Sequence, residues 1–561
     1  MSNPDRLRYV ALGGGNEVGA SSYLYEFPEA RILIDAGVRP KELGEASLPA
    51  LELLDEFPPD LILLTHAHLD HVGALPLVHR RFPSVPIYAT QATRTLAFEV
   101  LLDAVKVGLQ AGCALFSAQD VVKTINAITL LEVGQILEFG LKIEAREAGH
   151  LLGAVSYLFE SSAGLVMHAG DINNVSTLAS GGSHVVKIIQ PVQALIIEST
   201  YGDTMLPARK TQVREFINHI RTVLTRGGRI LIPTFALGRA QELLLILHNH
   251  ITGGQLPNVP IYLDGLVRGI TQQFENMHHE LPEALQNQSR TSRLAPFLRE
   301  PVRLVKDREH RERILSIQKP CIVLASSGML SGGASPQYAK VWLEQQDNAL
   351  FIVGYQDAES PGRRLLALEN GGEIQLPTGQ RGALETIRVI AEVKRYYLSA
   401  HADRGGLISF ASQYPEGVGI LMHGEPAARY ALQDSLRSSR PMKSPANLEW
   451  VNLLEERKVS TRAFIKPPSS REATPLPSDQ VIKTKYRKLE MKLEVTEAGQ
   501  IILTPPAGLA KQIASYVSSG VYTAELARTS ISKLKLRQRS GVLDDVLEES
   551  QTENELLEPS D

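Results

Sequence analysis

Residues 65–71 read THAHLDH and crowd three histidines and one aspartate into six positions directly after an apolar run, PDLILL. The apolar run predicts a buried strand, and a core cannot use four such side chains at its end. On a helix, His66 and Asp70 would share one face while His68 pointed away, whereas in a tight loop all four can converge. Imidazole and carboxylate without thiolate suit Zn²⁺, with Mn²⁺ or iron as lesser options. A hydrophilic turn with chance histidines is the alternative.

Four ligands from one loop can serve two ions but cannot complete the coordination of both. The sequence offers three more ligands, and each lies beside a glycine after an apolar run that predicts a strand. They are His150 in EAGHLLGA, Asp171 in MHAGDI and His423 in LMHGE. Each alone is more often an ordinary loop residue, but together with THAHLDH they predict a centre for two metal ions.

The composition excludes several classes of protein. With 561 residues, two or more domains are expected, and 43% hydrophobic and 21% charged residues are typical of a globular chain. The formal net charge of -4 gives no global sign of a polyanion partner, so any basic surface must be local. Cys113 and Cys321 alone provide neither a disulfide framework nor a zinc knuckle. No secretory signal and no apolar run of about 20 residues is visible, which favours a soluble, cytoplasmic protein with no membrane contact.

The hydrophobic pattern predicts many short strands. They fall at residues 8–12, 31–36, 60–64, 85–89, 141–147, 155–160, 164–168, 193–198, 395–400 and 418–424, with a helix at 96–111. A more regular alternation lies between them, with strands at 227–235, 301–305, 320–327 and 349–356 and an amphipathic helix at 238–250. Such alternation predicts an α/β unit with a parallel sheet.

The last hundred residues differ in composition. Residues 466–480 read as a Pro/Ser-rich linker, and residues 481–543 could form a small module with two basic clusters. Residues 544–561 are acidic, contain no Lys or Arg, and are expected to be disordered. This extension could bind RNA, mediate assembly or contact a protein partner.

Over residues 8–465 the chain resembles the metallo-β-lactamase-fold nucleases of the β-CASP group. The matching segments are LGGGNEVGASSYL, LIDAG, THAHLDHVGALP, AGHLLGA, GDI, ESTYGD, IPTFALGRAQELL, ASSGMLSGG, VGYQ, SAHAD and HGE. HxHxDH is shared by many hydrolases of the fold, whereas ESTYG, SAHAD and HGE in this order are specific to the β-CASP branch. The resemblance implies an α/β architecture, a four-layer αββα sandwich built from residues 1–203 and 391–465. A β-CASP domain, residues 204–390, would be inserted within it.

The resemblance also implies roles for the candidate ligands. One Zn²⁺ would be held by His66, His68 and His150, and a second by Asp70, His71 and His423, with Asp171 bridging the two. Two such ions can activate water at neutral pH and clamp the attacking and leaving oxygens of a phosphodiester.

Further residues carry over by the same resemblance. His401 of SAHAD would protonate the leaving oxygen, and Glu198 of ESTYG would hold that imidazole in place, so both are counted as catalytic together with Asp70. Asp35 would orient a ligand histidine. On their own, His401 and Glu198 are as often a satisfied loop histidine and a turn acid.

The substrate class follows from His423, because the RNA-cutting branch carries histidine at this late motif and the DNA-repair branch typically an apolar residue. The motifs AGHLLGA and SAHAD are similar to archaeal and bacterial relatives of the nuclease subunit of the cleavage and polyadenylation specificity factor, and ribonuclease J is a more distant relative. The resemblance therefore implies internal cleavage of single-stranded RNA in RNA processing or decay, with 5′–3′ exonucleolytic trimming as a second mode. Relatives often form homodimers.

RNA needs phosphate contacts beyond the metals. Gly238 and Arg239 begin a predicted helix, and a helix N-terminus with an arginine favours an anion. Ser326 and Ser327 open a loop of small residues whose N–H groups could bind another phosphate.

Three rival functions stay open. The same metals could serve a small-molecule hydrolase of the thioesterase or lactonase type. The chain could be a non-catalytic RNA-binding scaffold, or a regulator that binds RNA through its basic extension without cutting.

Overall fold

The computed structural model describes residues 7–183, 190–369, 371–378, 383–414 and 416–454, together with five short strands between Gln480 and Leu536. The chain divides into two compact units, Met1–Glu456 and Arg457–Asp561. Within the described residues, no helix combines the length and apolarity that a membrane crossing would need.

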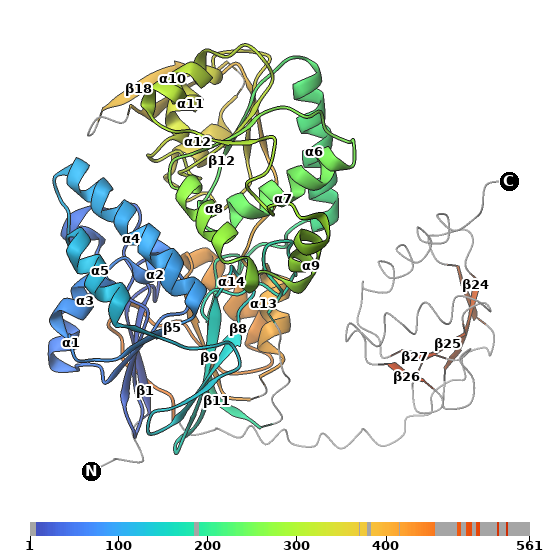
Figure 1. Cartoon of the computed structure of the whole chain (residues 1–561). Helices are drawn as coiled ribbons and strands as arrows, with labels where there is room; N and C mark the ends of the chain where they lie inside the picture. Colours follow the sequence, from blue (N-terminus) through green and yellow to red (C-terminus); the bar gives the residue numbers. More distant parts are fainter. Residues whose placement is uncertain are drawn as a thin grey trace. The chain divides into compact units, whose positions relative to one another are not determined.

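Two seven-stranded sheets form the body of the first unit (Figure 1). The first sheet has the order β22-β1-β2-β3-β4-β5-β6. Its strands are β22 (Val451–Asn452), β1 (Arg8–Gly13), β2 (Ser22–Glu26), β3 (Arg31–Ile34), β4 (Leu61–Leu63), β5 (Ile87–Ala89) and β6 (Ile128–Leu130). The second has the order β21-β20-β11-β10-β9-β8-β7. Its strands are β21 (Met442–Lys443), β20 (Val418–Met422), β11 (Val192–Glu198), β10 (Gly164–His168), β9 (Val155–Ser161), β8 (Lys142–Glu147) and β7 (Ile136–Glu138).

Successive side chains on these strands point to opposite faces and so belong to two different hydrophobic cores, one between the sheets and one between a sheet and its helices. On β11, Ile196 points into the layer between the sheets, while Leu195 and Ile197 face the helices outside. The first sheet is covered by α1 (Leu53–Glu56), α3 (Leu75–Arg81), α4 (Gln91–Ala111) and α5 (Ala118–Ala127), and the second by α13 (Arg404–Ala411) and α14 (Pro426–Leu436). The four-layer αββα sandwich predicted from the sequence is therefore confirmed.

A third sheet forms the inserted domain. Its six strands are all parallel, in the order β14-β13-β15-β12-β16-β19, which confirms the predicted parallel α/β unit. They are β12 (Ile230–Pro233), β13 (Ile261–Asp264), β14 (Val302–Leu304), β15 (Ile322–Ala325), β16 (Ala349–Ile352) and β19 (Glu392–Arg395). One face packs on α6 (Arg209–Thr225), α7 (Arg239–Thr252), α8 (Val267–Asn276) and α9 (Glu283–Ser292), and the other on α10 (Arg308–Ser316), α11 (Ser335–Trp342) and α12 (Pro361–Ala367). A hairpin, β17 (Glu373–Pro377) and β18 (Leu384–Arg388), completes it.

One predicted strand is wrong. The sequence predicts a strand at 395–400, but β19 ends at Arg395 and the following residues leave the sheet. The Tyr396 N–H still donates to Ile352 O of β16 at 2.8 Å. The chain then turns, and the Leu398 N–H donates to Tyr396 O at 3.1 Å. This departure carries the SAHAD segment out of the inserted domain and towards the sandwich.

The second unit contains a five-stranded antiparallel sheet in the order β23-β24-β25-β27-β26. Its strands are β23 (Gln480–Lys483), β24 (Glu490–Val495), β25 (Ile501–Thr504), β26 (Ala524–Leu526) and β27 (Leu534–Leu536). The predicted linker up to residue 479 and the acidic tail at 544–561 lie outside the described residues.

Candidate metal centre

The THAHLDH loop connects β4 to the four-residue helix α2 (Leu69–Val72). His68 keeps an extended backbone, with φ -65° and ψ 147°, and caps this helix, while Asp70 and His71 lie inside it. A single turn of helix after an extended loop turns the four side chains toward one region, which agrees with the convergence predicted from their spacing.

Two earlier motifs hold this loop from behind. The Ser21 N–H donates to Asp70 O at 2.8 Å, and the Ala36 N–H donates to His71 O at 2.8 Å. Gly37 lies so close that a Cβ atom there would meet Asp70 O at 1.7 Å. The segments GASS and LIDAG therefore fix the THAHLDH loop through backbone hydrogen bonds. Gly37 is required because no side chain fits between LIDAG and that loop.

The other three predicted ligands arrive from the second sheet. His150 follows β8, Asp171 follows β10 and His423 follows β20, each at the end of its strand. His423 has a φ of 47°, an unfavourable conformation for histidine, and its N–H donates to Gly14 O at 2.7 Å. The two sheets thus deliver all seven predicted ligands to one point.

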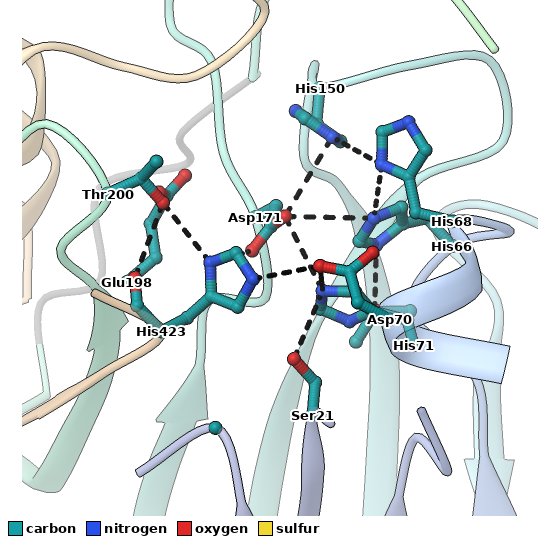
Figure 2. A network of polar contacts seen from close by, with 12 residues as sticks. Ser21, His66, His68, Asp70, His71, His150, Asp171, Glu198, Thr200 and His423 are labelled. Atoms are coloured by element: carbon teal, nitrogen blue, oxygen red, sulfur yellow. Dashed lines mark hydrogen bonds and ion pairs between the residues drawn. The ribbon is translucent and has the colours of Figure 1, made fainter. Parts of the chain in front are cut away.

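One group of ligands consists of His66, His68, His150 and Asp171 (Figure 2). His68 Nδ1 lies 3.0 Å from His66 Nε2 and 3.1 Å from His150 Nε2. Asp171 Oδ2 lies 3.7 Å from His66 Nε2 and 3.8 Å from His150 Nε2. Three imidazole nitrogens and one carboxylate oxygen therefore surround a common point.

A second group consists of Asp70, His71 and His423. Asp70 Oδ2 lies 3.2 Å from His423 Nε2 and 3.9 Å from His71 Nε2. Asp171 reaches this group too, with Oδ2 3.5 Å from His71 Nε2 and Oδ1 3.3 Å from His423 Nδ1. Among the described residues, Asp171 is thus the carboxylate in position to serve both groups, and it also forms a third cluster with Glu198 and His423.

The donor atoms fit a metal ion better than they fit one another. Burial lowers the pKa of His66, His68 and His150, that of His68 to about 4, so these rings are neutral. Neutral nitrogens 3.0 Å apart repel each other through their lone pairs unless a proton or a cation lies between them. Asp171 Oδ1 is buried and accepts no hydrogen bond from the residues that the structure describes, and a cation would satisfy this acceptor. Nitrogen and oxygen donors without sulfur are compatible with Zn²⁺.

Asp35 lies behind the second group, completely buried and with a φ of 59°. Its Oδ2 lies 2.7 Å from His71 Nδ1, which leaves His71 Nε2 facing the carboxylates of Asp70 and Asp171. The Thr65 N–H and hydroxyl donate to Asp35 at 2.7 and 2.6 Å. Burial raises the pKa of Asp35, although His71 and Thr65 oppose it. The carboxylate therefore fixes which nitrogen of His71 is free.

Sequence reasoning missed three hydroxyl groups around the ligands. Besides bonding Asp35, Thr65 Oγ1 lies 3.0 Å from His66 Nδ1. Ser21 Oγ lies 3.3 Å from His71 Nε2, and Thr200 Oγ1 lies 3.1 Å from His423 Nδ1. All three lie within segments already recognised as motifs, GASS, THAHLDH and ESTYG, and that position was the available signal.

His401 and Glu198 form a pair at the edge of the centre. His401 Nδ1 lies 3.1 Å from both carboxylate oxygens of Glu198, and Glu198 Oε1 also accepts the Ile172 N–H at 2.8 Å. Burial lowers the pKa of His401, but the carboxylates of Glu198, Asp171 and Asp70 together outweigh it and raise the pKa to about 9. The His401 ring centroid lies 4.4 Å from that of His150. The pair can therefore hold a proton directly beside the ligand cluster.

The ligand cluster is nearly closed to solvent. His66, His71, His150, Asp171 and His423 are each at most 3% exposed. His401 is more open, with a side chain 16% exposed, and a cavity of only 10 Å³ lies between His150 and Arg239. A substrate must approach past His68, Asp70 and His401, the least buried members.

The four predicted phosphate contacts lie on two separate loops of the inserted domain. Arg239 begins α7 and is buried, and its Nη1 has no hydrogen-bond partner among the described residues. Burial and Arg209 lower its pKa to about 9. Gly238 caps this helix with a φ of 72°. Ser326 and Ser327 follow β15, but their N–H groups already donate to Asp264 O and Gly332 O. The Ser327 hydroxyl is also engaged within the loop, since it accepts the Ser331 N–H at 3.1 Å and lies 3.3 Å from Ser331 Oγ.

Fold and centre together define the class: a metallo-β-lactamase-type sandwich with a His/Asp metal centre and a parallel α/β domain inserted beside it. Three family models match the chain. They are the metallo-β-lactamase superfamily at residues 15–206, the Beta-Casp domain at 240–365, and the RNA specificity domain of Zn-dependent metallo-hydrolases at 386–445.

Curated relatives extend the match over most of the chain. A transcription termination factor, FttA, of Methanosarcina mazei is 34% identical over 80% of this chain and 72% of its own length. The factor of the same name from Methanocaldococcus jannaschii is 30% identical over the same shares. An RNase J-like protein of that organism is 32% identical over 74% of this chain and 91% of its own length. The chain belongs to the β-CASP family of metallo-β-lactamase-fold RNA nucleases.

Proposed function

We propose that this protein is a zinc-dependent ribonuclease that hydrolyses phosphodiester bonds of single-stranded RNA. Cleavage is mainly internal, with 5′–3′ exonucleolytic trimming as a second mode. The observation that carries the proposal is the pairing of two ligand groups through Asp171 with a separate His401–Glu198 pair at the more open side. A phosphodiester needs both parts, because an anionic phosphate must be bound and a poor leaving group must be protonated.

The proposed metal ligands are the seven predicted ones. His66, His68 and His150 would hold one ion and Asp70, His71 and His423 the other, with Asp171 in reach of both groups. Two Zn²⁺ ions bound there would supply water activated at neutral pH and positive charge against the phosphoryl oxygens. Asp35 and Thr65 keep the imidazoles of His71 and His66 turned toward the centre.

His401 acts as the proton donor in this proposal. Glu198 engages Nδ1, so the proton that can move to the leaving oxygen is on Nε2. Glu198 itself is fully buried and anchored by the Ile172 N–H, so it positions His401 and does not reach substrate.

Arg239 and Gly238 at the start of α7, and Ser326 and Ser327 after β15, are the proposed phosphate contacts. The support is strongest for Arg239, because a buried guanidinium nitrogen without a partner is stabilised by an anion. The RNA would run between the sandwich and the inserted domain.

The biological setting follows from the relatives. Two of these relatives are transcription termination factors, which favours termination of transcription over general RNA decay for this chain. Release of transcripts by purified RNA polymerase, dependent on His401, would support this setting. A homodimer, and binding of RNA or a protein partner by residues 457–561, stay predictions.

A cleavage assay on metal-loaded protein tests the function. Wild type, His401→Ala and Glu198→Gln would each receive a long RNA labelled at its 5′ end, the same sequence as DNA, and the same RNA as a duplex. We expect internal fragments from single-stranded RNA only, loss of cutting in His401→Ala with metal retained, and a reduced rate in Glu198→Gln. Equal cutting of duplex and single strand would contradict the substrate assignment.

The small-molecule hydrolase is the main rival. It predicts turnover of a thioester or lactone by wild type and no RNA cleavage. A fully metal-loaded protein that cuts neither would favour the non-catalytic scaffold.

A further inference from the structure

Phe235 is an aromatic residue of the inserted domain that lies outside the hydrophobic cores. Among the described phenylalanines it is the one that neither belongs to nor packs against any of the three hydrophobic clusters. Its ring is half-buried. A core role, the usual explanation for a phenylalanine, therefore does not apply here.

The position of Phe235 is set by the parallel sheet. It follows β12, which lies between β15 and β16. The register pairs Ile230 with Ile322 and Ala349, so the chain continues to place Phe235 opposite the ends of both neighbouring strands. Ligands bind outside the carboxyl ends of strands in open α/β sheets, and Phe235 stands at that edge.

Both neighbouring loops present a glycine to this ring. A Cβ atom on Gly328 would meet Phe235 Cδ2 at 3.0 Å, and one on Gly354 would meet Cε2 at 2.9 Å. The two glycines hold the same edge of the ring, since both face Cδ2 and Cε2. Two backbones therefore fix one edge of an aromatic ring that the core does not require.

A row of rings connects this region to the metal centre. Tyr355 follows Gly354, and its hydroxyl donates to Glu425 Oε1 at 2.8 Å. Glu425 lies two residues after the candidate ligand His423 in the sequence. The Tyr355 and Tyr201 centroids are 6.1 Å apart, and the Tyr201 and His401 centroids are 6.3 Å apart. The edge of the sheet that carries Phe235 thus faces the proposed proton donor.

We propose that Phe235 is a stacking platform for one base of the single-stranded RNA, a few nucleotides from the bond that is cut. The proposal rests on the proposed function and adds a base contact to its phosphate contacts. Aromatic stacking suits a single strand of any sequence, because every base has a π-face, and a duplex would keep its bases paired and inaccessible. It gives a reason for three motifs, PTFALGR, SSGMLSGG and VGYQ, that supply Phe235 and its two glycines.

The test is a binding measurement with RNAs that each lack a single base. Metal-loaded, full-length protein carrying His401→Ala would be titrated with a fluorescent single-stranded RNA and with a series of abasic derivatives. Where a base stacks on Phe235, its removal should weaken binding about 5- to 100-fold. The same abasic position should cost nothing further in Phe235→Leu, and the penalty should return in Phe235→Tyr, which keeps the ring.

Phe351→Leu is the matched control, because Phe351 on β16 is fully buried and belongs to the core. It should lower the melting temperature and leave the abasic profile unchanged. An abasic profile that Phe235→Leu leaves unaltered would overturn the proposal while leaving the ribonuclease intact. Absence of any RNA binding or cleavage by wild type would instead overturn the proposed function, and the stacking role with it.

Discussion

Asp35→Asn tests whether a residue outside the ligand set controls a ligand. Asp35 Oδ2 faces His71 Nδ1 at 2.7 Å, while Oδ1 accepts the Thr65 N–H at 2.7 Å. Asparagine has one oxygen, and with that oxygen on the Thr65 N–H it presents an N–H to His71. His71 Nδ1 must then accept, so the ring proton moves to Nε2, the nitrogen that faces Asp70 and Asp171 at 3.9 and 3.5 Å.

The expected cost can be bounded. Loss of a partner that orients a metal-binding histidine typically costs 10–100-fold in affinity, or about 1.4–2.8 kcal/mol. The group of Asp70, His71 and His423 should weaken most, because Asp35 contacts His71 directly and reaches His66 of the other group only through the Thr65 hydroxyl.

Competition between metal-free protein and a chromophoric chelator for Zn²⁺ measures the two binding steps separately. We expect one of the two binding steps in Asp35→Asn to weaken by the stated factor and the other to change less. Asp60→Asn is the matched control, since Asp60 accepts the Arg31 N–H at 2.8 Å at the surface. If folded Asp35→Asn protein binds both ions as wild type does, the orienting role is refuted.

Three further predictions concern packing, thiols and metal. Gly37→Ala should cost about 3 kcal/mol or more in folding stability and abolish metal binding at His71, because its Cβ would overlap Asp70 O. A denaturant titration measures this cost. Gly253→Ala is the control and should be tolerated, because its Cβ would meet only Asn249 O, at 3.2 Å. Iodoacetamide should modify Cys113, which is half-buried, but not Cys321 in native protein near neutral pH, since burial raises the pKa of Cys321 to about 12. Mass spectrometry that shows both cysteines modified would contradict this. Chelation should lower the melting temperature, because ion at 100 times its Kd contributes about 2.7 kcal/mol, and an unchanged melting temperature would argue against an occupied centre.

The candidate ligands could be predicted because their chemistry is unusual where it occurs. Histidine and aspartate directly after apolar runs have no role in a core, so THAHLDH, His150, Asp171 and His423 all stood out. Serine and threonine are ordinary at strand ends, so nothing in their type distinguished Ser21, Thr65 and Thr200.

Topology limited the rest of the prediction. RYYLSA alternates as a strand does, yet its N–H groups donate to the neighbouring strand β16 only as far as Tyr396 before the chain turns toward the sandwich. Hydrophobic periodicity reports which side chains can be buried, and it does not report which neighbouring strand is present to accept hydrogen bonds. For the same reason the sequence places Phe235 only at the end of a predicted strand, residues 227–235, and it takes the sheet order to reveal two glycines beside it.

The most direct test of a two-metal ribonuclease is to follow RNA cleavage while Zn²⁺ is returned stepwise to chelated protein, with bound metal counted on the same samples. We expect no cutting without metal, and internal cleavage of single-stranded RNA that rises as the second equivalent binds. Full cutting by metal-free protein, or a protein with two bound ions that leaves RNA intact, would contradict the proposed function.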